Sequence, residues 1–169
     1  IIDKLKLDKQ GIIDNGPINI VMFGDSITHC MEDENGRDYD LVYWNLLRRK
    51  INKINDFVPV NVINSAIGGT TAKIGVDRMD RDVLSHNPDL LIVCFGLNDV
   101  NGTLDDYIDS LRQIFDQCLT ARIDAIFMTP NMLNTYIAED TLDRYKDYAV
   151  ITADFQNNGK MDLFINSAI

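Results

Sequence analysis

Three short motifs in this sequence carry the residue types that acyl transfer requires. They are Gly24-Asp25-Ser26, Gly68-Gly69-Thr70-Thr71 and Gly96-Leu97-Asn98-Asp99. Ser26 offers a hydroxyl nucleophile, Gly69 an exposed backbone N–H and Asn98 a side-chain amide. A nucleophile with two hydrogen-bond donors can attack a carbonyl carbon and hold the oxyanion that forms. Because this chemistry needs neither a metal nor a cofactor, we expect none.

Each motif follows an apolar run that predicts a β-strand. The three runs are residues 18–23, 60–64 and 90–95. If these strands are parallel neighbours, the motifs share the edge of the sheet at which open α/β sheets bind ligands. A serine at the start of the following helix also points its own backbone N–H toward that edge. Each motif alone fits an ordinary helix cap or turn, so the prediction depends on their joint occurrence.

Strand-like and helix-like stretches alternate along the chain, which predicts an α/β domain with a parallel sheet. Further strands are expected over residues 124–128 and 161–165, and helices over residues 40–55, 76–84, 103–119 and 139–152. Residues 1–17 form a polar lead-in that we expect to be irregular or to pair as an edge element, and residues 18–169 form a single domain. The predicted architecture is a three-layer α/β/α sandwich with about five parallel strands, wound as in flavodoxin.

Composition excludes several classes of function. The formal net charge of −10 over 169 residues and the lack of a strong basic cluster argue against nucleic acid as a partner. Cys30, Cys94 and Cys118 are widely spaced, so no disulfide framework is expected and a cytoplasmic location is favoured. His29 and His86 stand apart from them, which argues against a metal site. No membrane-length apolar run or signal peptide is visible, although the chain begins with isoleucine rather than methionine.

Taken together, the motifs resemble those of the GDSL/SGNH hydrolase family of esterases and lipases. Gly24-Asp25-Ser26-Ile27-Thr28 matches the first block of that family, residues 64–71 the second and Gly96-Leu97-Asn98-Asp99 the third. The resemblance implies that Ser26 is the nucleophile. It also implies that the Gly69 N–H and the Asn98 amide hold the oxyanion together with the N–H of Ser26. We interpret Asp25 and Asp99 as groups that brace the loops rather than as acids or bases.

The last block of that family, Asp-x-x-His, is missing from these residues. Its histidine acts as the general base and its aspartate orients the histidine. No histidine follows His86, and neither Asp154 nor Asp162 has one three residues later. We expect that the chain is truncated and that the block lies beyond Ile169, so that the chain as given is nearly inert. A natural pseudoenzyme is the other explanation. We interpret His29 as a loop histidine near the cleft and His86 as structural.

The sequence therefore predicts a serine esterase that acts on a small-molecule ester with a short acyl or acetyl group, including acetyl groups on carbohydrate. Two alternatives remain open. A catalytically silent domain would keep the oxyanion pocket and bind a ligand without turnover. A phospho-acceptor signalling domain would use the same alternating sheet, and Asp25, Asp99 and Thr129 fit it superficially. However, that class needs an acidic pair after the first strand and a lysine after the fifth strand, and neither is present.

Overall fold

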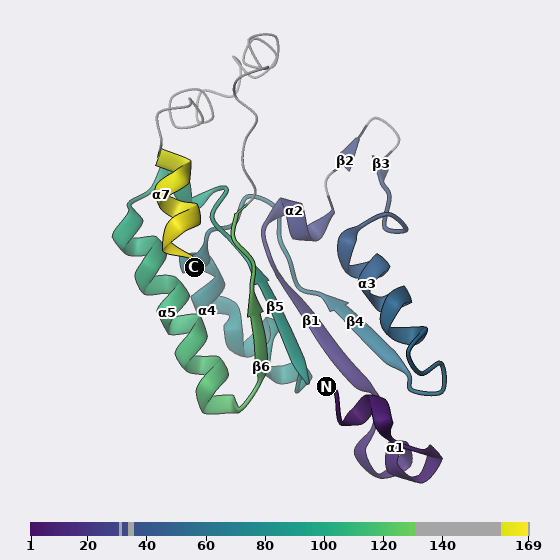
Figure 1. Ribbon diagram of the computed structural model, residues 1–169. Helices are drawn as coiled ribbons and strands as arrows, with labels where there is room; N and C mark the ends of the chain where they lie inside the picture. Colours follow the sequence, from purple (N-terminus) through teal and green to yellow (C-terminus); the bar gives the residue numbers. More distant parts are fainter. Residues whose placement is uncertain (31, 34–35, 131–159, 169) are drawn as a thin grey trace.

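The computed structural model describes residues 1–30, 32–33, 36–130 and 160–168 (Figure 1). Its main sheet has four parallel strands in the order β4-β1-β5-β6. Their bounds are β1 Ile18–Gly24, β4 Val60–Asn64, β5 Leu90–Cys94 and β6 Asp124–Phe127. Along the chain this is the order second, first, third, fourth, as in flavodoxin-like sheets. The predicted α/β class and winding are confirmed.

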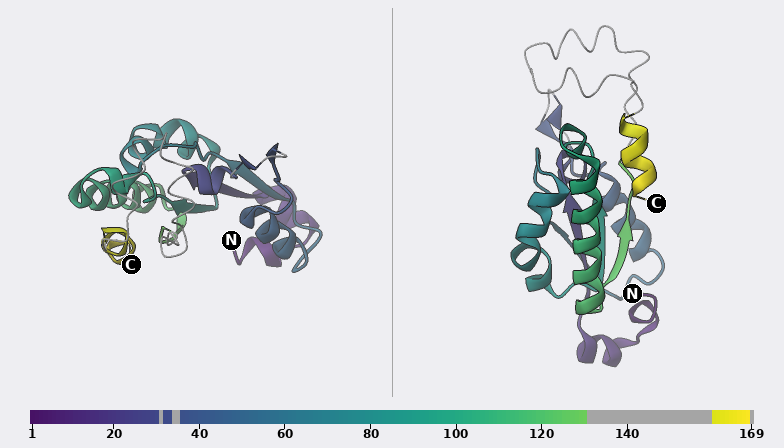
Figure 2. Two further views of the ribbon diagram at one scale, coloured as in Figure 1. Left: turned by 90° about the horizontal axis from the view of Figure 1, so that it is seen from above. Right: turned by 90° about the vertical axis from the view of Figure 1, so that its left-hand side faces the viewer.

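The helices cover both faces of the sheet (Figure 2). They are α1 Lys9–Asn15, α2 Ser26–His29, α3 Tyr43–Asn52, α4 Ala72–Asp82, α5 Leu104–Ala121 and α7 Lys160–Ser167, with 3-10 turns at η1 Lys4–Lys6, η2 Leu84–His86 and η3 Asp99–Asn101. A small antiparallel pair, β2 Glu32–Asp33 and β3 Gly36–Arg37, stands apart from the main sheet. No helix in the described ranges is both long enough and apolar enough to cross a membrane.

Alternate side chains of β1 pack into two hydrophobic cores, one on each side of the sheet. Val21 and Phe23 join the core under α4 and α5, whereas Ile20 and Met22 join the core under α3. All four side chains are fully buried. A strand covered on both faces is apolar along most of its length, which is why residues 18–23, with only Asn19 polar, lack the alternation of a half-exposed strand.

The fifth strand expected over residues 161–165 is wrong, because these residues lie in helix α7. Phe164 is 1% exposed and stacks on Tyr107 of α5, with ring centroids 5.1 Å apart. The Ser167 hydroxyl donates to the Phe164 carbonyl oxygen over one helical turn. A five-residue apolar pattern fits a strand or a helix equally well, and here packing on α5 decides between them. The helix expected over 139–152 lies outside the described residues.

The N-terminal lead-in is also more ordered than expected. Residues 1–16 contain η1 and α1 rather than an irregular or edge-paired segment. The carboxylate of Asp8 caps α1 by accepting from the Gly11 N–H at 2.9 Å. Lys4 then attaches the segment to the sheet, since its ammonium group donates to Asp89 at 2.9 Å and to the Pro17 carbonyl at 3.0 Å.

The helix expected over residues 40–55 is shorter than predicted. It spans Tyr43–Asn52 as α3. Leu41 and Ile54 fall within the expected range but lie outside the helix, and they are 69% and 70% exposed. By contrast, α5 begins close to the expected position, because the hydroxyl of Thr103 caps it by accepting from the Asp106 N–H.

Candidate active site

The three motifs meet along the carboxyl edge of the sheet. Strand β1 lies between β4 and β5, with Met22 paired to Asn64 and Gly24 paired to Cys94. The chain segments that leave these strands are therefore neighbours. Ser26 opens α2 after β1, Gly69 lies in the loop between β4 and α4, and Asn98 comes just before η3.

Asp25 fixes the turn that presents Ser26. Its carboxylate accepts a hydrogen bond from the Ile27 N–H at 3.0 Å and so caps α2. The side chain is 1% exposed, and this burial raises the pKa of Asp25 above its ordinary value. Ser26 itself is half-buried at the start of the helix. This geometry fits the bracing role that we expected for Asp25.

The two glycines of the second motif lie against the serine. A β-carbon built on Gly68 would stand 3.6 Å from the Ser26 Cβ, so the loop passes directly beside the hydroxyl-bearing residue. Gly69 has a φ of +77°, which favours glycine, and a β-carbon there would meet nothing within 4 Å. The backbone conformation, rather than a lack of space within the protein, therefore favours glycine at position 69.

Asn98 connects the third motif to the second. Its Nδ2 donates to the Thr70 carbonyl oxygen at 3.0 Å, which uses one of the two amide hydrogens. Thr70 is in turn held by its hydroxyl, which donates to the Ile67 carbonyl at 2.7 Å. The second hydrogen of the Asn98 amide remains able to donate to a bound ligand.

Asp99 also connects the third motif to the segment that follows the second motif. Its Oδ1 accepts from the Ala72 N–H at 2.8 Å, at the first residue of α4. The side chain is 5% exposed, and burial raises the pKa of Asp99 to about 6. Its second oxygen, Oδ2, is buried and has no hydrogen-bond partner among the described residues. The hydrogen bond from Ala72 holds the two loops together, whereas burial makes the ionised form of the Asp99 carboxyl less favourable.

The two histidines lie in different places. His29 is the last residue of α2, half-buried, and its carbonyl oxygen accepts from the Asn64 side chain at 3.2 Å. His86 is exposed in η2, at the amino end of β5. Within the described parts of the chain, Ser26 forms no hydrogen bond to either of them. The same ranges contain no cluster of His, Cys, Asp or Glu that could hold a metal ion.

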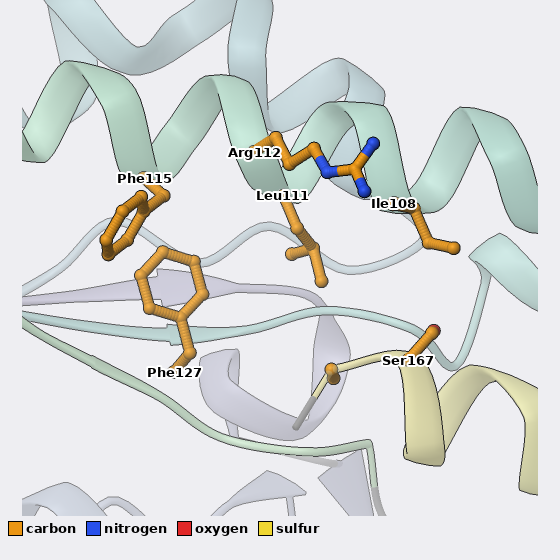
Figure 3. A pocket seen from close by; sticks show the side chains of 7 residues that line it. Ile108, Leu111, Arg112, Phe115, Phe127 and Ser167 are labelled. Atoms are coloured by element: carbon orange, nitrogen blue, oxygen red, sulfur yellow. The ribbon is translucent and has the colours of Figure 1, made fainter.

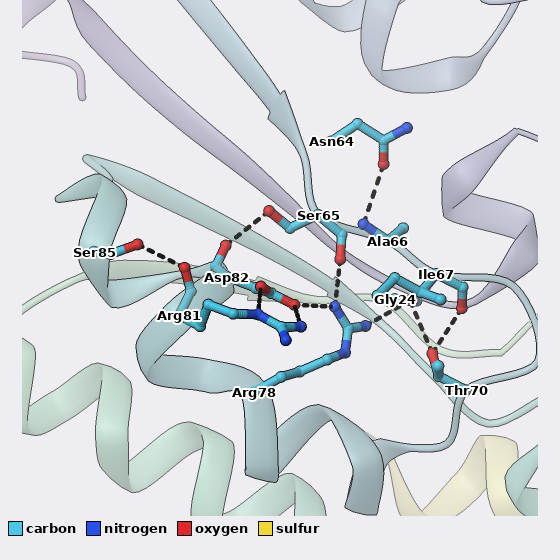
Figure 4. A network of polar contacts seen from close by, with 10 residues as sticks. All are labelled: Gly24, Asn64, Ser65, Ala66, Ile67, Thr70, Arg78, Arg81, Asp82 and Ser85. Carbon is cyan, nitrogen blue, oxygen red and sulfur yellow. Dashed lines mark hydrogen bonds and ion pairs between the residues drawn. The ribbon is translucent and has the colours of Figure 1, made fainter.

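Arg78 is the residue near this edge that sequence reasoning missed. It lies on the inward face of α4 beside Gly75 and Met79 and is 6% exposed. Figure 4 shows its guanidinium pointing toward the ends of β1 and β4. The signal was present in the sequence, since a charged residue on the apolar face of a helix needs buried partners.

A separate apolar pocket of about 320 Å³ lies between α5, β6 and α7. Its lining includes Leu111, Phe115 and Phe127, with Arg112 at one side (Figure 3). It contains no residue of the three motifs, so it is distinct from the candidate site.

Comparison with known proteins is consistent with this geometry. The sequence matches the family model described as the GDSL-like Lipase/Acylhydrolase family over residues 22–163. A comparison with curated protein sequences found no match.

Three solved structures illustrate the similarity of fold. A lipase/acylhydrolase from Enterococcus faecalis is 22% identical, with a TM-score of 0.66, over 89% of this chain and 69% of that one. An acetyl xylan esterase variant from Geobacillus stearothermophilus is 20% identical, with a TM-score of 0.60, over 89% and 72%. A two-domain esterase active on acetylated mannans is 25% identical, with a TM-score of 0.55, over 70% and 32%.

Proposed function

The chain belongs to the GDSL-like lipase/acylhydrolase family, and we propose that it is a serine ester hydrolase whose nucleophile is Ser26. The observation that carries the proposal is the approach of the Gly68-Gly69 loop to Ser26, where a Gly68 β-carbon would lie 3.6 Å from the serine Cβ. Asn98 is tied to the same loop through Thr70. These contacts support a role as oxyanion donors for the N–H groups of Ser26 and Gly69 and for the Asn98 amide.

The proposed reaction proceeds through an acyl-enzyme. The Ser26 Oγ attacks the ester carbonyl carbon and gives up its proton to a general base. The three donors stabilise the oxyanion, each contributing about 2.7–4 kcal/mol to lowering the barrier in related chemistry. The bond to the alcohol then breaks, and the alcohol leaves with the proton returned by the base. Water attacks the acyl carbon in the second half and releases the carboxylic acid and Ser26.

The general base is the part of this scheme that the described residues do not supply. The family resemblance assigns it to the histidine of an Asp-x-x-His block, which these 169 residues do not contain. Loss of the histidine alone costs about 10⁶-fold in kcat in a triad enzyme. We therefore expect the 169-residue chain by itself to turn over very slowly.

We propose short acyl groups as the substrate class, including acetyl groups carried by a sugar. Gly68 and Gly69 are exposed and present no side chain beside Ser26, which leaves room for a bulky alcohol portion such as a carbohydrate. Two of the similar structures belong to proteins described as an acetyl xylan esterase and an esterase active on acetylated mannans. Those descriptions support the choice of acetylated carbohydrate for the first assays.

A catalytically silent binding domain is the second candidate. It is favoured by the lack of a general base beside the nucleophile, since neither histidine is hydrogen-bonded to Ser26 in the described part of the chain. Such a domain would use the oxyanion donors to hold an ester or acetyl carbonyl without breaking it.

Hydrolysis of p-nitrophenyl acetate and of acetylated xylo-oligosaccharides tests both candidates. The assay compares the 169-residue chain, the full reading frame that contains it, and Ser26→Ala in each. Ser85→Ala is the control, because Ser85 is exposed in η2 away from the motifs. Activity that disappears with Ser26→Ala and survives Ser85→Ala supports the esterase. Equal rates in the wild type and Ser26→Ala contradict it, and saturable binding of the oligosaccharide would then favour the silent domain.

A further inference from the structure

Arg78 binds the backbone at the carboxyl ends of two neighbouring strands, β1 and β4 (Figure 4). Its Nη2 donates to the Gly24 carbonyl oxygen at 3.2 Å, and its Nη1 donates to the Ser65 carbonyl oxygen at 2.5 Å. Gly24 ends β1 two residues before Ser26, and Ser65 follows β4 three residues before Gly68. A single side chain therefore binds both the backbone segment that leads to Ser26 and the segment that leads to the Gly68-Gly69 loop.

The guanidinium is itself held firmly. Its Nη1 also donates to Asp82 Oδ2 at 3.0 Å, one helical turn later on α4. Its Cζ lies 4.3 Å from the centroid of the Phe23 ring, an arrangement that favours a cation over an aromatic face. Asp82 is further fixed by Ser65, whose hydroxyl donates to the Asp82 carbonyl oxygen at 2.7 Å. The position of the two carbonyls is thus set by a cation with little freedom to move.

Burying the charged guanidinium of Arg78 costs desolvation free energy, so the charge is expected to have a role at this position. Arg78 is 6% exposed and lies among Phe23, Phe95 and Met79, where an apolar side chain would pack without a desolvation penalty. The planar guanidinium can reach two carbonyls and a carboxylate at once, whereas a lysine ammonium lacks that fork. The Gly24 carbonyl also accepts from the Ile67 N–H at 3.0 Å, so the clamp acts on a backbone already shared by both loops.

We propose that Arg78 is a positioning residue for ester hydrolysis. By clamping the Gly24 and Ser65 carbonyls, it fixes the distance between Ser26 and the Gly68-Gly69 loop. It does not touch the substrate. The inference rests on the proposed function, because it assigns Arg78 a role in the reaction at Ser26.

The test compares Arg78→Met and Arg78→Lys with the matched control Arg81→Met. Arg81 also pairs with Asp82, through Nε at 2.5 Å and Nη2 at 2.9 Å, but its side chain is exposed and makes no hydrogen bond to Gly24 or Ser65. Removing Arg81 therefore perturbs the shared carboxylate without releasing the clamp. Kinetics are measured in the form of the protein that shows Ser26-dependent hydrolysis.

We expect kcat to fall with KM nearly unchanged. A misplacement of about 1 Å costs on the order of 10²-fold in rate, so Arg78→Met is expected to lose roughly that factor. Arg78→Lys keeps a positive charge and should recover part of the loss. Arg81→Met should stay within about twofold of the wild type, since exposed ion pairs contribute little. Arg78→Lys also carries the test if Arg78→Met fails to fold.

Amide hydrogen exchange followed by NMR gives a second readout that needs no turnover. The Ile67 N–H should exchange faster in both Arg78 variants and not in Arg81→Met, while Val93 in the core of β5 stays protected in all of them. If hydrolysis does not depend on Ser26 in any form, the proposed function fails and exchange at Ile67 alone decides whether the clamp exists. Arg78 variants that match Arg81→Met in kcat and in exchange overturn the inference. An increase in KM at constant kcat also overturns it.

Discussion

Replacing Asp99 with asparagine should change how the stability of the protein depends on pH. Asp99 is 5% exposed, and burial raises the pKa of its carboxyl to about 6 from an ordinary value of 3.8. The folded state therefore holds the proton more tightly than the unfolded state. Stability falls as the pH rises through the window between these two values, and the full penalty is present above pH 6. Asparagine cannot ionise, so the Asp99→Asn variant lacks this contribution.

The size of the effect follows from the two pKa values. One pKa unit corresponds to about 1.36 kcal/mol, so ionised Asp99 disfavours the folded state by about 3 kcal/mol. The amide oxygen of asparagine can still accept from the Ala72 N–H, as Asp99 Oδ1 does at 2.8 Å. The amide nitrogen would occupy the place of Oδ2, which has no hydrogen-bond partner among the described residues. The substitution therefore removes a charge while keeping the brace.

Urea unfolding of the wild type and Asp99→Asn between about pH 5 and pH 7.5 measures this difference. That range avoids the isoelectric region of the chain near pH 4.5. About half of the penalty, roughly 1.4 kcal/mol, develops across it, so the variant should gain that much on the wild type as the pH rises. Asp25 is also buried and its pKa is also raised, but it is present in both proteins. Parallel stability curves for the two proteins would refute the reasoning.

Three further substitutions test why particular residues occupy their positions. The effect of each is measured as the change in the free energy of unfolding in urea. Gly24→Ala should destabilise by about 2–3 kcal/mol, because its β-carbon would lie 2.3 Å from the Cys94 carbonyl oxygen and must push β1 from β5; a loss below that of Gly69→Ala would contradict it. Gly69→Ala should cost only about 1 kcal/mol, since φ is +77° but the space is open. Thr103→Ala removes the cap on the Asp106 N–H and should cost about 1 kcal/mol, whereas an unchanged midpoint would show that the cap contributes nothing.

The four strands of the main sheet and their winding were predictable because a buried sheet leaves a strong local signal in the sequence. Residues 90–95 are all apolar and residues 18–23 are apolar except for Asn19, and each run is followed by glycine and polar residues that end a strand. Parallel pairing then follows from the helices between the strands, and the pairing places Ser26, Gly69 and Asn98 at one edge. The motifs could therefore be located from local sequence plus one topological rule.

Short elements with mixed patterns were not predictable in the same way. Residues 161–165 read as a strand, but Phe164 packs on Tyr107, a contact between positions far apart in the sequence. The N-terminal residues read as irregular, yet Lys4 reaches Asp89 and gives the segment a place on the domain. In both cases tertiary contacts decide the local structure, and no window of a few residues contains them.

The partners of the buried charged residues Asp99 and Arg78 could not be predicted from the sequence for a related physical reason. At strand ends and helix starts the regular backbone hydrogen-bond pattern stops, and side chains from other segments bind the backbone groups that lie there. Asp99 accepts from an N–H 27 residues earlier, and Arg78 donates to a carbonyl 54 residues earlier. A motif search finds Ser26, Gly69 and Asn98 because each stands in a short contiguous motif. The groups that hold those residues come from other segments, so only the folded chain brings Arg78 beside Gly24 and Asp99 beside Ala72.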